Sequence, residues 1–348
     1  MRFEGAWTAI VTPVTAADQV DWAGLEKNIK FQISQGIAGV VPTGTTGESP
    51  TLSWDEHNKV IETALRLAKD KCGVIAGTGS NSTYETLEST RQAVKYGAEA
   101  ALLVDCYYNG PSSLELREEY HAAVAREFPQ VSIIPYVIPG RTGTVLLPED
   151  LAILASECSN VCAVKEATGD LGRMAKTRAL LGKGFSIMSG DDDITFKMMT
   201  DPAIAANGVI SVASNVAPAA VEEMTRKALA GDLAGAEKLQ NALAPLFGIV
   251  TVKVDNERVL PDGSKVVVND RFRNPLATKT LMAALGMPSG PCRRPLGRMT
   301  RSGIEIVRSA ARKVWQANPE ILMPVQDFYG VDVGARLADD KVWNVLAC

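Results

Sequence analysis

The stretch AGVVPTGTTGESPTLSWDEHNKVIETALRLA, residues 38–68, contains the pattern that decides the fold. It begins with a short apolar run rich in valine, which is typical of a buried strand, and a GTTGE turn follows. Ser53 then precedes Glu56 by three positions, which is the spacing of a helix-capping box. Apolar residues recur after it at helical spacing, so the segment predicts one strand, one turn and one helix.

The same pattern recurs along the chain, and its apolar runs are continuous, which favours parallel strands covered on both faces. The predicted strands are AWTAIVTPV (6–14), AGVVPTGT (38–45), CGVIAGTG (72–79), AALLVDCYY (100–108), VSIIPYVIP (131–139), VCAVKEAT (161–168), FSIMSGDD (185–192) and NGVISVASN (207–215). Eight strand and helix units favour an α/β fold of the (β/α)8 TIM-barrel type. An open, doubly wound sheet is the alternative.

The sequence after the last predicted strand is mostly helical. We therefore expect a catalytic barrel over residues 1–230 and a helical C-terminal region over residues 231–348. Alternating β-prone residues flank the turn signal Pro261-Asp262-Gly263, which predicts an inserted hairpin near residues 251–271. The last residues of the chain are expected to form a C-terminal extension.

Composition narrows the class of partner. A formal net charge of −4 provides no basic field for nucleic acid or an anionic membrane, which favours small-molecule substrates. No run of 18 apolar residues is present, and the N-terminus makes a poor signal peptide, so a cytoplasmic location is expected. Two histidines and six dispersed cysteines offer few ligands for zinc, so no metal is predicted.

Lys165 ends the apolar run VCAVK (161–165). Because side chains alternate along a strand, Val161, Ala163 and Lys165 share one face, and Lys165 is expected to point into the barrel at its C-terminal mouth. A nucleophilic lysine needs desolvation to lower a pKa of roughly 10.4, and an apolar strand supplies it. The alternative is a solvated strand end whose lysine pairs with Glu166 or another carboxylate.

Other polar residues end strands at the same mouth. Thr45 and Thr46 carry hydroxyls that suit carboxylate binding or proton relay, and the phenol of Tyr136 suits proton transfer. Arg141 suits binding of a substrate carboxylate through its planar fork. The alternatives are a turn without a ligand, packing at the rim and a surface ion pair. The aspartates of SGDDD (189–193) are expected to be helix-capping acids in an exposed loop rather than metal ligands.

Several motifs in order resemble the Schiff-base lyases of the dihydrodipicolinate synthase and N-acetylneuraminate lyase family. They are GTTGE, the Tyr107-Tyr108 pair, Y-x-x-P-x-R-T, V-K-E-A-T-G, S-G-D-D and G-V-I-S-V, and the likeness runs from the N-terminus to about Arg308. The resemblance implies a (β/α)8 barrel with a helical C-terminal domain, arranged as a homotetramer built from two dimers. It also implies no cofactor, because Lys165 itself forms an imine with pyruvate.

The resemblance also implies roles for single residues. Catalytic roles fall to Lys165, Tyr136, Thr45 and Tyr108, and substrate binding falls to Thr46, Arg141, Gly190 and Ile210. Tyr136 would pass protons at the imine, and Thr45 would relay them together with Tyr108 from a neighbouring subunit. Thr46 would bind the pyruvate carboxylate, and Arg141 would bind the carboxylate of aspartate semialdehyde.

The implied reaction condenses pyruvate with L-aspartate-4-semialdehyde to 4-hydroxytetrahydrodipicolinate, a step in lysine and diaminopimelate biosynthesis. Arg141 favours this reaction over a second one, aldol cleavage of a 2-keto-3-deoxy sugar acid or 4-hydroxy-2-oxoglutarate. A third possibility, from another class, is a catalytically silent paralogue that binds small carboxylates.

Some family members are inhibited by lysine at a dimer interface. The matching positions here are Ser49, Trp54, His57, Asn81, Glu85 and Tyr107, with Trp54 in place of the histidine that is frequent in bacterial members. Lysine is therefore an expected effector, and ordinary capping and interface residues are the alternative. Two departures bear on the loops of the site, namely Val137 after Tyr136 and Asp105-Cys106 before the tyrosine pair.

Overall fold

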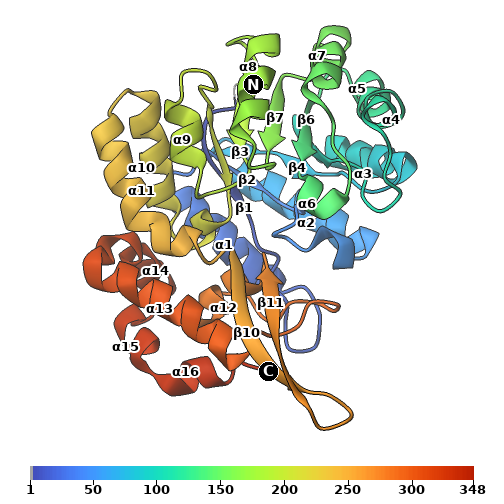
Figure 1. Ribbon diagram of the computed structural model, residues 1–348. Helices are drawn as coiled ribbons and strands as arrows, with labels where there is room; N and C mark the ends of the chain where they lie inside the picture. Colours follow the sequence, from blue (N-terminus) through green and yellow to red (C-terminus); the bar gives the residue numbers. More distant parts are fainter. Residues whose placement is uncertain (1–2) are drawn as a thin grey trace.

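The computed structural model describes residues 3–348, and its centre is a closed barrel of parallel strands (Figure 1). Every pairing between neighbouring strands of this sheet is parallel. The strands are β1 (Gly5–Ala9), β2 (Gly39–Val41), β3 (Gly73–Val74), β4 (Ala76–Gly77), β5 (Ala100–Val104), β6 (Ser132–Val137), β7 (Ala163–Glu166), β8 (Ser186–Ser189) and β9 (Gly208–Ser211). The predicted barrel is confirmed.

Two of these strands are parts of one barrel position. β3 pairs with β2 and β4 pairs with β5, and Ile75 between them donates its backbone N–H to the Val40 carbonyl at 3.1 Å. The segment 73–77 therefore closes the ring, which makes eight positions. Gly39 and Gly73 leave room for the Trp7 ring, because a Cβ on either would lie 2.2 Å or 2.3 Å from it.

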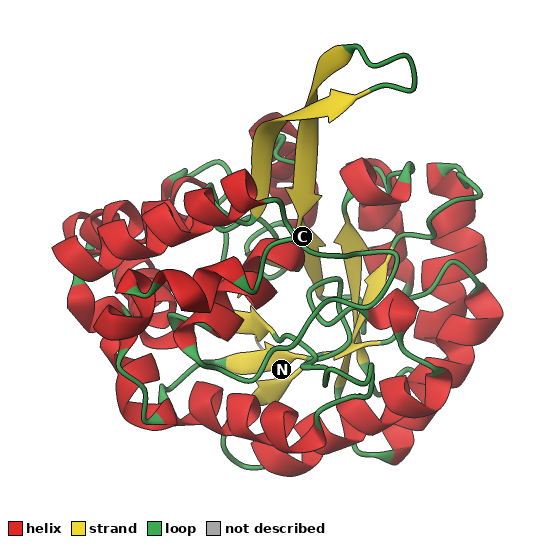
Figure 2. Cartoon of the chain, turned by 90° about the horizontal axis from the view of Figure 1, so that it is seen from below, coloured by secondary structure: helices red, strands yellow, loops and turns green. Residues whose placement is uncertain are grey.

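A ring of helices surrounds the strands (Figure 2). In chain order the helical segments are α1 (Trp22–Ser34), α2 (Trp54–Ala68), α3 (Thr83–Lys95), α4 (Ser113–Glu115) with α5 (Ala122–Glu127), α6 (Pro139–Thr142), α7 (Pro148–Glu157), α8 (Leu171–Leu181), α9 (Thr195–Thr200) and α10 (Pro218–Leu229). The predicted capping box is present at the start of α2, where Ser53 and Glu56 bond each other's backbone N–H groups. Such a cap fixes where the helix begins after the GTTGE turn.

The alternation of side chains separates an inner core from an outer one. Inside the barrel lie residues such as Trp7, Ile134, Ala163 and Ile210. The intervening residues, Val164 among them, pack outward against the helices. Lys165 follows the same alternation as Ala163, which brings its side chain inside the barrel.

The C-terminal region is helical apart from one hairpin. Its helices are α11 (Leu233–Phe247), α12 (Leu276–Leu285), α13 (Arg301–Ala317), α14 (Met323–Tyr329), α15 (Val333–Ala338) and α16 (Asp340–Asn344). They share one apolar core with α1 and α10, and the phenol of Tyr329 donates to Asn28 Oδ1 of α1 at 2.8 Å. The C-terminal extension is therefore packed on the body of the protein.

The predicted hairpin is confirmed and is longer than expected. It consists of β10 (Thr251–Val259) and β11 (Lys265–Arg273), which pair in an antiparallel register from Thr251 with Arg273 to Val259 with Lys265. It projects from the body in both ribbon views (Figures 1 and 2). The division of the chain after residue 230 stays a prediction. Among residues 3–348, no helix has the length and apolar character needed to cross a membrane.

Candidate active site

Lys165 lies inside the barrel near the C-terminal end of β7, and only 5% of the residue is exposed. Its amine makes no ion pair with any residue between 3 and 348, and the neighbouring Glu166 is bound instead by Arg173, with 3.2 Å between Nε and Oε1. The alternative of a solvated strand-end ion pair is therefore wrong for this lysine. The Lys165 amine is therefore buried and has no ion-pair partner among residues 3–348.

Burial lowers the pKa of the Lys165 amine to about 8, because the charged form loses its hydration. The negative charges of Asp191 and Asp192 oppose this shift in pKa, and the positive charge of Arg141 adds to it. A pKa near 8 leaves a substantial neutral fraction close to neutral pH. The environment therefore meets the requirement for a nucleophilic amine.

Tyr136 occupies the position on β6 that pairs with Lys165 on β7. The lysine Nζ lies 4.1 Å from the centroid of the phenol ring. Burial raises the pKa of Tyr136 to about 12, while the charge of Arg141 and a hydrogen bond with the Thr45 side chain lower it. The phenol therefore stays protonated at neutral pH, beside the amine and in a position to donate a proton.

The GTTGE turn brings Thr45 and Thr46 to the same mouth of the barrel. Contacts to Glu48, the last residue of the turn, fix its conformation. Glu48, which has a left-handed backbone at φ 56°, accepts from the Lys279 amine at 2.5 Å and from the Arg293 backbone N–H at 2.8 Å. Both Glu48 and Lys279 are buried. A buried ion pair between the turn and α12 therefore holds the two threonines in place.

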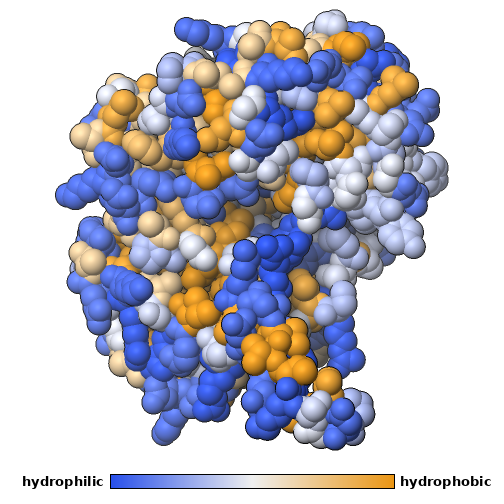
Figure 3. Space-filling view, in the orientation of Figure 1, coloured by the Kyte–Doolittle hydropathy of each residue, from blue (hydrophilic) through white to orange (hydrophobic). Residues whose placement is uncertain are grey.

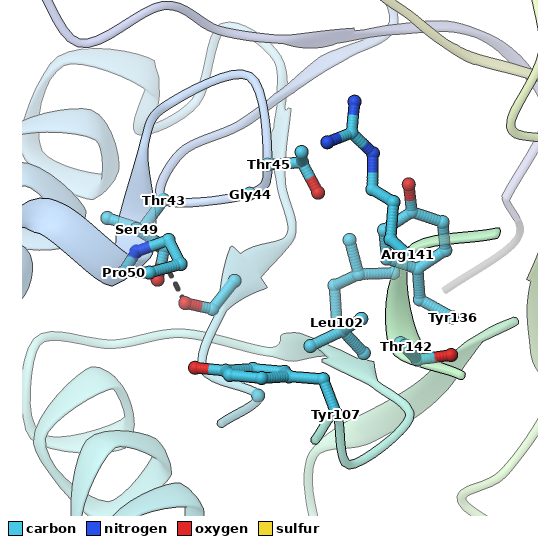
Figure 4. Close-up of a pocket in the computed structure, with 13 residues that line it drawn as sticks. Thr43, Gly44, Thr45, Ser49, Pro50, Leu102, Tyr107, Tyr136, Arg141 and Thr142 are labelled. Carbon is cyan, nitrogen blue, oxygen red and sulfur yellow. Dashed lines mark hydrogen bonds between the residues drawn. The ribbon is translucent and has the colours of Figure 1, made fainter. Parts of the chain in front are cut away.

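Two adjoining cavities share the residues Thr45, Tyr136 and Arg141. The larger cavity, of about 450 Å³, contains Lys165, Thr46 and Gly190. The smaller one, of about 230 Å³, extends from the shared residues to Ser49 and Tyr107. Figure 4 shows the side chains of Thr45, Tyr136 and Arg141 on one side of the smaller cavity and Ser49, Pro50 and Tyr107 on the other.

Gly190 approaches Lys165 closely, and Ile210 lies deeper. A Cβ on Gly190 would stand 2.5 Å from the Ala167 Cβ and 3.2 Å from the Lys165 Cε, so the close approach needs glycine. Ile210 is buried in the inner core of the barrel and does not line the larger cavity. Its role in substrate binding stays a prediction.

The prediction for the SGDDD loop is wrong for two of its three aspartates. Asp192 is buried and accepts the backbone N–H groups of Val212 and Ala213, each at 3.0 Å. Asp191 is half-buried beside Lys165, and burial raises the pKa of its carboxyl to about 6. Only Asp193 is exposed. Sequence reasoning missed this because SGDDD has the composition of a surface loop, whereas the barrel mouth covers it.

The structure does not bring Tyr108 to the cavities of its own chain. The residue is 90% exposed and has a left-handed backbone at φ 79°, a conformation that costs free energy for a non-glycine residue. Tyr107, its neighbour, lines the smaller cavity instead. Relay of protons by Tyr108 across a subunit boundary stays a prediction.

The two sequence departures have structural explanations. Asp105 is buried, with one carboxylate oxygen 2.9 Å from His121 Nε2 and the other accepting the Leu146 N–H at 3.1 Å. These bonds fix the start of the loop that carries the tyrosine pair. Val137 packs in the outer core, on the face of β6 opposite Tyr136, so it does not enter the site.

The residues predicted to bind lysine fall into three pairs. Ser49 and Tyr107 line the smaller cavity, while His57 is buried and Trp54 is partly exposed, with their rings 5.2 Å apart. Asn81 and Glu85 meet at Ser80, whose hydroxyl donates to Glu85 Oε2 at 2.5 Å. Lysine binding at these residues stays a prediction.

Sequence reasoning missed the residues that the end of the hairpin brings to the site. Asn274 donates from Nδ2 to the Thr46 hydroxyl at 2.9 Å, and the backbone carbonyl of Asn274 accepts from Arg141 Nη2 at 3.0 Å. Lys253, Arg271 and Arg273 line the larger cavity with Lys165. A signal was present, since Lys253 and Arg271 share one face of the predicted hairpin if its strands pair symmetrically around Asp262.

Comparisons with known proteins agree with this geometry. Residues 2–313 match the model of the dihydrodipicolinate synthetase family. The 4-hydroxy-tetrahydrodipicolinate synthase of Methanothrix thermoacetophila is 39% identical over 313 residues, which cover 90% of this chain and 97% of that protein.

Two solved structures are also similar. The chloride-inhibited dihydrodipicolinate synthase of Acinetobacter baumannii complexed with pyruvate has a TM-score of 0.80 and 35% identity, and the match covers 90% of this chain and 99% of that one. The enzyme of Cyanidioschyzon merolae with lysine bound has a TM-score of 0.80 and 31% identity, with coverage of 90% and 98%. This chain therefore belongs to the dihydrodipicolinate synthetase family.

Proposed function

We propose that this chain condenses pyruvate with L-aspartate-4-semialdehyde to form 4-hydroxytetrahydrodipicolinate, with a covalent imine on Lys165 and no other cofactor. The observation that carries the proposal is the buried, unpaired amine of Lys165 beside the Tyr136 phenol, in a cavity that Arg141 also lines. An amine of lowered pKa, a proton donor and a carboxylate-binding fork are the groups that this reaction needs.

The chemistry follows from those groups. The neutral Lys165 amine attacks the ketone carbon of pyruvate, and loss of one water from the resulting carbinolamine leaves an imine. Removal of a methyl proton gives an enamine, whose carbon attacks the aldehyde carbon of the second substrate. The amino group of that substrate then attacks the imine carbon, which closes the ring and releases the Lys165 amine.

The roles of the other residues are part of this proposal. Tyr136 gives and takes the protons of carbinolamine formation and dehydration, and Thr45 connects that phenol to Tyr108 of a neighbouring subunit. Thr46 binds the pyruvate carboxylate, with Gly190 and Ile210 shaping the space around the imine. Arg141 binds the carboxylate of the semialdehyde, because a planar guanidinium matches a carboxylate in two parallel hydrogen bonds.

The proposal extends to assembly and regulation. Tyr108 is almost fully exposed in the single chain, which suits a residue that reaches a partner's site in a homo-oligomer of two dimers. Lysine is proposed as an effector that binds near Ser49, Glu85 and Tyr107, where an acid can pair with its ammonium group. The catalytic barrel would then span residues 1–230, and residues 231–348 would support it.

A coupled assay tests the reaction directly. Purified protein with pyruvate is supplied with L-aspartate-4-semialdehyde in one series and challenged with 2-keto-3-deoxy sugar acids or 4-hydroxy-2-oxoglutarate in another. The proposal expects consumption of the semialdehyde and no comparable cleavage of the keto acids. Cleavage without condensation would assign the chain to the aldolases, and failure of both reactions would leave a ligand-binding protein.

A further inference from the structure

The base of the inserted hairpin has two different faces. Val252 of β10 and Phe272 of β11 are paired and pack into the core shared with α13. Because side chains alternate, the opposite face carries Thr251 with Arg273 and Lys253 with Arg271. That second face lines the larger cavity, which also contains Lys165. The hairpin is thus anchored by its apolar face and presents its basic face to the site.

The placement of these cations is unfavourable unless something negative lies between them. Lys253 and Arg271 stand directly opposite each other, and like charges in that position destabilise a strand pair. Neither they nor Arg273 makes an ion pair with any of residues 3–348. Figure 3 shows strongly hydrophilic residues over the root of the hairpin, with apolar patches of the body beside them.

The outer part of the same hairpin face is arranged differently. There the charged side chains find partners across the two strands, with Lys265 Nζ lying 2.7 Å from Glu257 Oε1. Asn269 likewise donates to Asp255 Oδ1 at 2.7 Å. The charge of Lys265 is therefore compensated at the exposed end of this face, whereas no ion pair among residues 3–348 compensates the three cations where the hairpin meets the cavity.

The basic face also connects to the residue that is proposed to bind the semialdehyde. Arg273 Nη1 donates to the Gly140 carbonyl at 2.7 Å, next to Arg141. Burial lowers the pKa of the Arg141 guanidinium, and the charge of Arg273 adds to this shift. The cavity as a whole is lined by five basic side chains and three acidic ones. One of those acids, Asp192, is already bound to two backbone N–H groups.

We infer that Lys253, Arg271 and Arg273 form a second carboxylate-recognition element, which binds the carboxylate of the aldehyde substrate at the cavity mouth and holds the substrate for transfer to Arg141. This inference rests on the proposed function, and it assigns a specificity role to the inserted hairpin. Because L-aspartate-4-semialdehyde carries an ammonium group as well as a carboxylate, it has no net charge, and the basic face acts at short range through charge-assisted hydrogen bonds to the carboxylate. Arg273 additionally positions the backbone beside Arg141.

The test is the double variant Lys253→Gln with Arg271→Gln, compared with the control Arg258→Gln with Lys265→Gln. The control removes the same charge from the hairpin, at residues that pair with Asp270 and Glu257 rather than lining the cavity. We expect the test variant to lose about fivefold or more in kcat/KM for the aldehyde. Its kcat/KM for pyruvate should change less.

Each other outcome has a definite meaning. Equal losses in both double variants, or losses of equal size for pyruvate and the aldehyde, would overturn the inference, as would no loss at all. Wild-type protein assayed in parallel separates this from the proposed function. If the wild type condenses the two substrates and the variants match it, only the role of the hairpin fails. If the wild type does not condense them, the proposed function fails.

Discussion

Tyr136 and Lys165 occupy paired positions on neighbouring parallel strands, and this register places the lysine Nζ 4.1 Å from the centre of the phenol ring. The relationship is set by the backbone, because both side chains must point inward if their strands keep register and alternation. Burial shifts the two pKa values in opposite directions, because it favours the neutral form of each group. It moves the amine toward its neutral form and keeps the phenol protonated.

Removing the Tyr136 hydroxyl should abolish proton transfer by this residue while the ring continues to pack in the site. Tyr136→Phe is expected to lower kcat about 100-fold or more, since a positioned acid–base group contributes at least that much. The measurement is steady-state condensation with both substrates at saturation. Tyr84→Phe, on an exposed position of α3, serves as the control and should keep the wild-type rate. Near-normal activity in Tyr136→Phe would mean that another group carries the proton.

The pKa of Lys165 predicts a pH dependence for adduct formation. Its pKa of about 8 lies below the usual value for lysine, so the reactive neutral amine increases as pH rises and approaches its maximum above pH 8. The rate of pyruvate adduct formation should therefore rise about tenfold from pH 6 to pH 7 and level off above about pH 8.5. Tyr136, with a pKa of about 12, does not titrate in this range. A rate that keeps rising to pH 10 would show that the amine is not desolvated.

The buried pair of Glu48 and Lys279 predicts a large effect on stability. Lys279→Met leaves the Glu48 carboxylate buried without its cation, so the free energy of unfolding should fall by about 3–5 kcal/mol. Chemical denaturation at a fixed protein concentration measures this change. Lys265→Met is the matched control, because its pair with Glu257 is exposed and should contribute less than about 1 kcal/mol. Similar losses in the two variants would argue against a special role for the buried pair.

The proposed lysine site predicts loss of regulation without loss of catalysis. Millimolar lysine should inhibit the wild-type protein, and Glu85→Ala should abolish the inhibition because the ammonium group of lysine loses its counter-charge. Inhibition curves for the condensation reaction provide the measurement. Glu88→Ala on the same helix removes an exposed acid that pairs with Arg91 and should stay sensitive. A wild-type protein that ignores lysine would remove this site from the account.

The fold could be predicted because its signals are local and repeated. Each apolar run gave a strand, and alternation along VCAVK placed Lys165 inside the barrel. The split of the strand at residues 73–77 could not be predicted, because its first half pairs with β2 and its second half with β5. Those pairings join residues far apart in the sequence.

The site was predicted less completely for a similar physical reason. The residues that end barrel strands converge by topology, so Thr45, Tyr136 and Lys165 could be found from their positions. Asn274 and the basic face of the hairpin reach the cavity only through the packing of Val252 and Phe272 against the C-terminal helices. No short-range pattern indicates that packing. The burial of Asp192 likewise depends on two backbone N–H groups of the loop after β9.

The central claim is that Lys165 forms an imine with pyruvate, and borohydride trapping tests it most directly. Protein incubated with pyruvate and reduced should gain the mass of one reduced pyruvyl group per chain, and peptide mapping should place it on Lys165. Lys165→Arg should gain none, whereas Lys176→Arg, at an exposed lysine of α8, should be labelled like the wild type. An unlabelled wild-type protein, or a label on any other lysine, would contradict the account.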